Sequence, residues 1–199
     1  MTRCHKTCFL LLLLIIPAVT LAKNPLSRNQ FSLDLGIWKP GSLDKHPSRP
    51  FENVEGGRTC WGFSYTTPSW QDFAFRVSIF QWGQNFEKQS SRLASVTLRH
   101  LSLELKNAIL QQSTISPFVS FGAAAIWSRE VPTGGQSGNI PLDRAGFGGN
   151  VGAGLDIIVA PHLAIAVEYQ YLYARFEKNV GLTEVYSGPK ISLRIGYRF

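Results

Sequence analysis

The chain has few cysteines, and no long apolar run follows its first 22 residues. Its 199 residues include three cysteines, of which Cys4 and Cys8 lie in the N-terminal segment. Cys60 is therefore the one cysteine in the rest of the chain, which excludes an internal disulfide framework. No later segment is long and apolar enough for a membrane helix, so only a β-barrel could carry residues 23–199 across a membrane.

Clustered basic residues and paired histidines are also lacking. The lysines and arginines are mostly dispersed singly, without the run or stripe that is typical of nucleic-acid binding. After the N-terminal segment the histidines are His46, His100 and His162, expected on a loop, a strand and a turn, and their spacing fits no metal site. We predict no nucleic-acid partner, no bound metal and no cofactor.

The N-terminus has the features of a secretory signal. Arg3 and Lys6 precede the apolar run Phe9–Ile16, which is too short to span a bilayer, and small residues suitable for cleavage lie near Ala22. We predict a signal peptide over 1–22 and one domain over 23–199. The net charge of +7 falls to +5 because the two basic residues leave with the signal, and this balance favours contact with anionic lipopolysaccharide.

The last ten residues, Lys190–Phe199, alternate strictly between two kinds of side chain. Ile191, Leu193, Ile195, Tyr197 and Phe199 fall on one face of a strand, and polar or small residues fall on the other. In a soluble protein this strand would be an exposed edge that invites aggregation. In a transmembrane barrel its apolar face contacts lipid and both edges are paired.

Seven further segments show the same period, although one is irregular. Between residues 93 and 106 the apolar phase changes, with Val96 and Leu98 in one register and Leu101, Leu103 and Leu105 in the other, and a bulge near Arg99 would reconcile them. The eight expected strands span 32–37, 61–66, 73–80, 93–106, 119–127, 150–157, 164–173 and 190–199.

The connections between these segments alternate in length. Long links are expected at 40–56, 83–92, 128–144 and 176–187, tight turns at 67–70 and 159–162, and an intermediate link at 107–114. This places all long loops at one end, as in barrels with short periplasmic turns and long external loops. We predict an all-β fold, an eight-stranded antiparallel transmembrane β-barrel of up-and-down topology.

The inward faces of these strands carry charge. Eight strands enclose only enough space for side chains, so the interior should be a packed polar network with little room for a pore. The predicted lumen network comprises Asp34, Arg76, His100, Glu104, Glu168 and Arg194. Aromatic residues near strand ends are expected to form the interfacial girdles. These are Trp61, Tyr65, Trp70, Trp82, Trp127, Tyr173, Tyr197 and Phe199.

Four stretches carry a resemblance to a known superfamily: Ser116–Ala125, Gly148–Asp156, Glu168–Tyr171 and Arg194–Phe199. Together they resemble the small eight-stranded outer-membrane barrels, which include OmpX, OmpW and the membrane domain of OmpA. The resemblance implies a monomer in the outer membrane of a Gram-negative bacterium, in contact with its lipid and lipopolysaccharide. The terminal pattern also resembles the signal that the barrel assembly machinery reads, which here falls on Leu193, Ile195, Gly196, Tyr197 and Phe199.

Barrels of this superfamily serve as adhesins, small-solute channels, lipid-modifying enzymes and anchors, so the resemblance leaves the function open. We predict a non-enzymatic protein of the cell envelope with an adhesive or structural role. Its contact surface is expected on long loops carrying Trp127, Arg129, Glu130, Arg144, Phe176, Glu177 and Lys178. The alternative is a narrow, porin-like channel of the OmpW type.

A second alternative is a hydrolase that modifies lipid A. His100-Leu101-Ser102 resembles the His-x-Ser motif of outer-membrane lipid A deacylases, in which the histidine activates the serine. That motif continues with asparagine, whereas Leu103 follows here, and Gln111 and Gln112 occupy the region where a carboxylate is expected. A hydrogen-bonding role in the lumen is the favoured interpretation of the pair.

Overall fold

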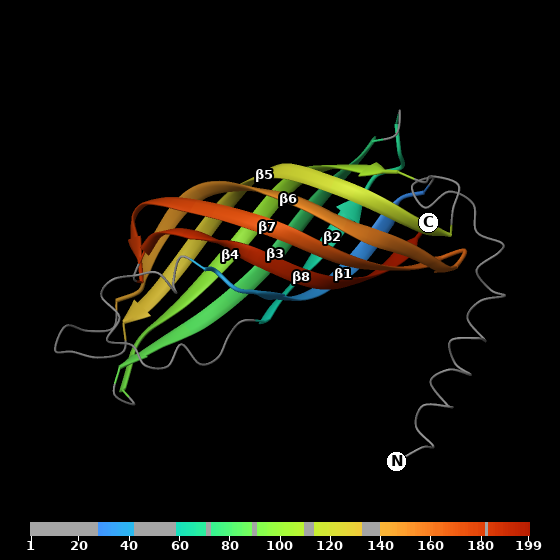
Figure 1. Ribbon diagram of the computed structural model, residues 1–199. Coiled ribbons are helices and arrows are strands. Elements are labelled where there is room, and N and C mark those ends of the chain that lie inside the picture. Colours follow the sequence, from blue (N-terminus) through green and yellow to red (C-terminus); the bar gives the residue numbers. More distant parts are fainter. Residues whose placement is uncertain are drawn as a thin grey trace, which may run out of the picture.

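Eight β-strands follow one another along the chain, and each pairs antiparallel with the next. The first strand also pairs with the last, from Gln30 opposite Arg198 to Trp38 opposite Lys190, which closes the barrel (Figure 1). The prediction of an eight-stranded antiparallel barrel is confirmed. The strands are β1 (Gln30–Trp38), β2 (Thr59–Thr66), β3 (Phe73–Lys88), β4 (Ser91–Ala108), β5 (Ile115–Pro132), β6 (Leu142–Ala160), β7 (Leu163–Val180) and β8 (Thr183–Arg198).

The computed structural model describes residues 28–41, 59–70, 73–88, 91–109, 114–132, 140–181 and 183–199. The predicted signal peptide, its cleavage site near Ala22 and His46 lie outside the described residues. No helix in the described ranges is long and apolar enough to cross a membrane.

Side chains along each strand alternate between the lumen and the outer surface. On β8, Ile191 and Leu193 are 57% and 43% exposed, whereas Ser192 and Arg194, which alternate with them, are almost fully buried. Apolar residues face outward on all eight strands, and a closed barrel with such a surface is stable in lipid. We call this surface the lipid-facing belt; it includes Phe31, Leu33, Phe63, Phe75, Val77, Ile79, Leu101, Leu103, Val119, Phe121, Val151, Leu155, Val167, Tyr169, Ile191, Leu193 and Ile195.

The two faces of β4 exchange their polarity at Arg99. On the side toward the β4–β5 connection, Leu101 and Leu103 face outward. On the other side, Val96 and Leu98 face inward and are at most 1% exposed, while the outward positions are polar. Apolar side chains therefore face lipid in one half of the strand and the barrel interior in the other.

The predicted bulge near Arg99 is wrong. Arg99 pairs with Gln81 on β3 and with Trp127 on β5, and the registers on both sides continue without a shift. The register shift between β3 and β4 lies instead between Phe86 and Glu87. The phase change in the sequence follows from a change in the surroundings of the barrel, not from an extra residue in the strand.

Other strands change in the same way at the same end of the barrel. Ile79 faces outward on β3, but Trp82, three residues further on, is buried in the interior. On β7 the outward Tyr173 is followed three residues later by the inward Phe176. Outside, exposed polar residues such as Arg99, Arg129 and Arg175 replace the apolar ones. This part, which we call the upper barrel, therefore has the polarity of a water-surrounded β-barrel, with its apolar residues inside.

Most of the predicted loops 83–92 and 176–187, and about half of 128–144, are strand, which corrects the sequence interpretation. Connections at this loop end shrink to 89–90, 133–141 and 181–182, and only the link between β1 and β2 keeps its length. Strands β3 to β8 have 16 to 19 residues. Crossing a bilayer takes about 9–11 tilted strand residues. The surplus builds the upper barrel, opposite the turn end, where tight connections such as 161–162 lie.

Arginine substitutions along the outward face of β4 should locate the boundary of the lipid-facing belt. We expect Leu103→Arg to lower the free energy of unfolding in lipid vesicles by about 2–4 kcal/mol, because the charge would lie in hydrocarbon. Thr97→Arg, in the upper barrel, should change it by less than about 0.5 kcal/mol. Urea titrations of both variants measure the difference, and equal losses would place Thr97 inside the membrane.

Candidate functional site

Five ionised side chains form a continuous chain of ion pairs across the lumen. Arg194 contacts Asp34 at 2.7 Å and Glu168 at 2.5 Å. Arg76 contacts the other oxygen of Glu168 at 2.7 Å and also pairs with Glu104. All five residues are at most 4% exposed. We call this set the ionic chain; it joins β1 and β8 through β7 to β3 and β4, so it spans the interior from wall to wall.

Hydroxyl and amide groups donate further hydrogen bonds to the carboxylates of Glu104 and Glu168. Ser120 donates to Glu168 at 2.7 Å, and Glu104 accepts from Ser102 at 2.6 Å and from Asn150 at 3.1 Å. A buried charge is tolerated only when it is paired and hydrogen-bonded, and both carboxylates meet this condition. Gly122 leaves room for the side chain of Glu104, since a Cβ at this position would lie 2.6 Å from Cγ of Glu104.

A second buried ion pair lies nearer the turn end and was not among the predicted site residues. Lys106 Nζ is 2.5 Å from Asp156 and lies 4.0 Å from the centre of the Phe118 ring. Lys106 lies two residues from the inward Glu104 on β4, and Asp156 lies two residues from the inward Gly154 on β6. This two-residue spacing is the feature of the sequence that indicates their inward direction. This pair adds a separate polar layer below the ionic chain.

His100 lies in the lumen but does not join the ionic chain. Its ring stacks on Phe80 with 4.4 Å between centroids, and neither ring nitrogen has a hydrogen-bond partner among the residues that the structure describes. Ser102, which faces the same lumen, donates to Glu104. The histidine and serine of the His-x-Ser sequence thus have separate partners and form no nucleophile–base pair.

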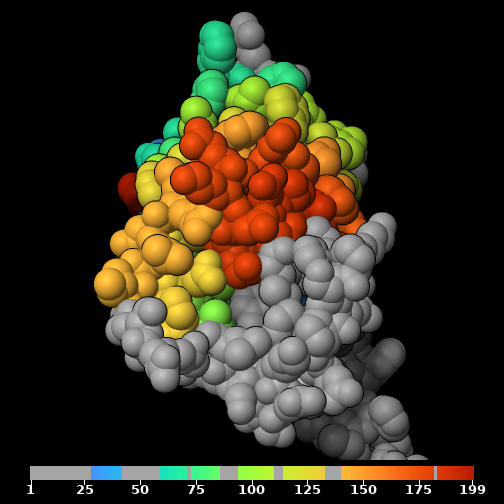
Figure 2. Space-filling view, turned by 90° about the vertical axis from the view of Figure 1, so that its left-hand side faces the viewer, coloured from blue at the N-terminus to red at the C-terminus, as the bar shows by residue number. Residues whose placement is uncertain are grey.

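An apolar layer fills the interior above the ionic chain. Trp38 and Trp82 pack edge to face at 5.3 Å, and Tyr186 lies 6.0 Å from Trp82 and 6.1 Å from Phe176. In the end-on view of Figure 2 the segment around the β7–β8 turn, in orange-red, gathers over the middle of the loop end. The layer comprises Trp38, Phe80, Trp82, Val96, Leu98, Ile126, Leu172, Phe176, Val180 and Tyr186.

Several predicted surface positions need correction. Trp82 was expected in an interfacial girdle, but it is 1% exposed and belongs to the apolar layer. Phe176 was expected on a loop that makes external contacts, and it too is buried inside. The other residues of that predicted contact surface lie on β5, β6 and β7 instead of on loops. Trp61, Trp127 and Tyr173 do face outward at the upper edge of the lipid-facing belt.

The residues of the predicted assembly signal lie on β8 or directly after it. Leu193, Ile195 and Tyr197 face outward, and Phe199 is 56% exposed just beyond the strand. Gly196 faces inward, where a Cβ would lie 2.4 Å from the side-chain nitrogen of Gln30. Their recognition by assembly machinery stays a prediction. Within the described ranges, no three histidine, cysteine, aspartate or glutamate residues are grouped so as to hold a metal ion.

Comparison with solved structures reveals a set of similar barrels. Neisserial surface protein A is 18% identical, with a TM-score of 0.57 over 86% of this chain and 96% of that one. The N-terminal β-barrel domain of Pseudomonas aeruginosa OprF is 14% identical, with a TM-score of 0.52 over 86% and 98%. The attachment invasion locus protein Ail of Yersinia pestis is 18% identical, with a TM-score of 0.51 over 86% and 97%.

The chain has the fold of the small eight-stranded outer-membrane barrels. This likeness confirms the superfamily resemblance at the level of the fold. No protein-family model matches the chain, and no curated protein matches it in sequence. The resemblance is thus carried by strand number, pairing and closure, which similar barrels share at identities below 20%.

Proposed function

We propose that the protein is a non-enzymatic, non-conducting barrel of the bacterial outer membrane, with an adhesive or structural role at the cell surface. The observation that carries the proposal is the double closure of the interior. The ionic chain crosses the lumen within the lipid-facing belt, and the apolar layer fills it above. An apolar constriction excludes ions because it does not hold water.

The upper barrel supports the surface role. It extends the strands beyond the lipid-facing belt and presents exposed Arg129 and Arg175 on paired strands. Side chains on paired strands keep their positions better than those on long loops, which suits a permanent contact surface. The fold is shared with Ail, an attachment protein by its name.

Planar-bilayer recording tests the closed interior. We expect the reconstituted wild-type protein to give no discrete current steps, because Trp82 and Phe176 block the upper lumen and the ionic chain blocks the lower one. An outer-membrane porin in the same chamber serves as the positive control. Regular steps that change in size with Arg76→Gln or Glu168→Gln, but not with the exposed control Glu177→Gln, would establish the channel alternative instead.

A deletion strain separates adhesion from a structural role. Loss of attachment to surfaces with unchanged resistance to detergent supports adhesion, whereas detergent sensitivity with normal attachment supports a structural role. Complementation with His100→Ala provides the enzymatic control, because lipid A acylation should remain that of the wild type. A change in acylation on this substitution would contradict the non-enzymatic assignment.

A further inference from the structure

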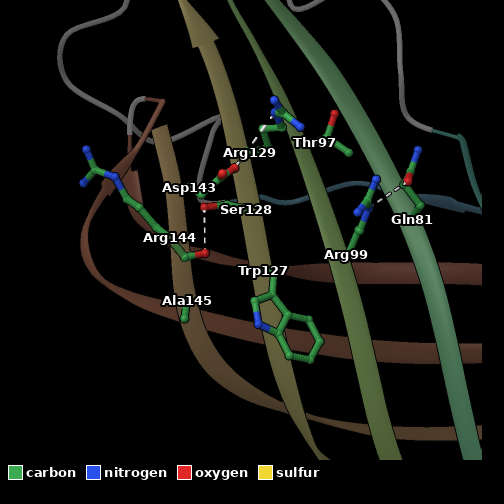
Figure 3. Close-up of a pocket in the computed structure, with 9 residues that line it drawn as sticks. All are labelled: Gln81, Thr97, Arg99, Trp127, Ser128, Arg129, Asp143, Arg144 and Ala145. Carbon is green, nitrogen blue, oxygen red and sulfur yellow. Dashed lines mark hydrogen bonds and ion pairs between the residues drawn. The ribbon is translucent and has the colours of Figure 1, made fainter. Parts of the chain in front are cut away.

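The outer surface carries a groove where β3 to β6 leave the lipid-facing belt. This groove, of about 780 Å³, is lined by Gln81, Arg99, Trp127 and Arg129 among others (Figure 3). A second groove of about 290 Å³ adjoins it, sharing Gln81 and Arg99. The second groove is otherwise mostly apolar, with Trp61, Phe63 and Ile79 in its walls. The two together form an amphipathic surface, charged above and apolar below.

The charged part of this surface has a net positive character. Arg99 and Arg129 face the same side, since Arg99 is opposite Trp127 and Arg129 is opposite Thr97 across the β4–β5 pair. Arg99 donates one hydrogen bond, to Gln81 at 3.2 Å. Arg129 is 4.0 Å from Asp143, and these side chains are 60% and 75% exposed. A pair so long and so exposed holds its partners weakly.

Both guanidinium groups therefore keep donors for an external anion. A guanidinium has five N–H donors in a planar fork that matches the oxygens of a phosphate. The two arginines lie just above the lipid-facing belt, the depth at which lipid headgroups carry their phosphates. Trp127, opposite Arg99 and two residues from Arg129 along β5, is 47% exposed and of the residue type favoured at that depth.

We propose that this surface is a binding site for a phosphorylated, multiply acylated lipid of the outer leaflet. Arg99 and Arg129 bind its phosphate, and the apolar groove beside Ile79 receives an acyl chain. In an outer membrane the lipid with this chemistry is lipid A. A free phosphate would use the arginines but not the apolar groove, so the continuity of the two grooves favours the lipid. The inference rests on the outer-membrane location proposed above.

Native mass spectrometry of the full barrel in detergent, titrated with bisphosphorylated lipid A, tests the site. Loss of one charge-assisted contact of about 1.4 kcal/mol weakens binding about tenfold. Arg99→Gln and Arg129→Gln should each weaken lipid A binding by about this factor. The control is Arg175→Gln, an exposed arginine on the outward face of β7 that lines neither groove, and its affinity should equal that of the wild type.

Four further outcomes make the test decisive. Dephosphorylated lipid A should bind equally to wild type and variants, and the deacylated phosphorylated disaccharide should bind wild type more weakly than lipid A. Equal losses in all three arginine variants would show general charge attraction and overturn the site. Displacement of lipid A by inorganic phosphate alone would overturn the lipid assignment. Heat-modifiable gel migration confirms folding in each variant, and current recordings on the same samples test the proposed closed barrel independently.

Discussion

Replacing Glu168 with glutamine should lower the free energy of unfolding by about 3–5 kcal/mol, the cost of breaking a buried ion pair. Glu168 is the central member of the ionic chain and neutralises Arg76 and Arg194 at once. Its glutamine variant keeps the shape of the side chain but leaves the two guanidinium groups without their shared anion. Urea titration of the barrel in detergent, followed by gel migration of folded and unfolded forms, measures the loss.

The same titration includes two comparisons. Glu177→Gln, on the exposed outer face of β7, should change the unfolding free energy by less than about 0.5 kcal/mol. The double variant Glu168→Gln, Arg194→Gln should lose less than the two single variants together, since each single variant disrupts the same contact. Strictly additive losses would show that Glu168 and Arg194 do not interact.

Trp82→Ala should lower the free energy of unfolding by about 3–5 kcal/mol, the usual cost of emptying a large aromatic site in a packed core. Trp82 is 1% exposed and contacts the rings of Trp38 and Tyr186. The alanine variant removes the centre of the apolar layer and leaves a cavity that neighbouring rings fill only in part.

The matched control for this variant is Trp61→Ala. Trp61 is 51% exposed on the outer surface, where detergent or lipid replaces the lost ring, so the expected loss is below about 1.5 kcal/mol. Urea titrations in the same detergent compare the two variants. If Trp61→Ala costs as much as Trp82→Ala, the two tryptophans occupy equivalent environments and the apolar layer does not exist.

The membrane half of the fold could be predicted because each lipid-facing strand repeats one signal. Alternation along Lys190–Phe199 identifies both faces of β8 without reference to any other strand. The upper barrel could not be predicted in this way. Apolar side chains face outward where lipid surrounds the barrel, but they face inward where water surrounds it. The changed phase around Arg99 marks that reversal. If lipid is assumed along the whole strand, the same change of phase predicts a bulge. The strand extensions resemble loops in the sequence for the same reason, because their outward residues are polar.

The lumen residues could be predicted as a set but not as a network. Register and parity place Glu168 and Arg194 on the same side of adjacent strands, so their contact was foreseeable. The contact between Arg76 and Glu168 crosses the barrel and depends on strand tilt and side-chain reach, which no local pattern contains. Trp82 shares its parity with Arg76, so its inward direction was present in the sequence; residue type alone misled the girdle assignment.

The exchange of polarity at Arg99 also fixes how deeply the barrel is immersed. A shift of one residue pair in the direction of the turn end would draw Arg99 and Arg129 into hydrocarbon, and the opposite shift would expose Ile79 and Leu101 to water. Because both shifts raise the free energy, the thickness of the bilayer has to match the height of the lipid-facing belt. A membrane thinner or thicker than the lipid-facing belt will deform around it, at a cost of fractions of a kcal/mol for each ångström of mismatch. The protein is therefore suited to one membrane thickness, and lipids of the matching length will gather around it.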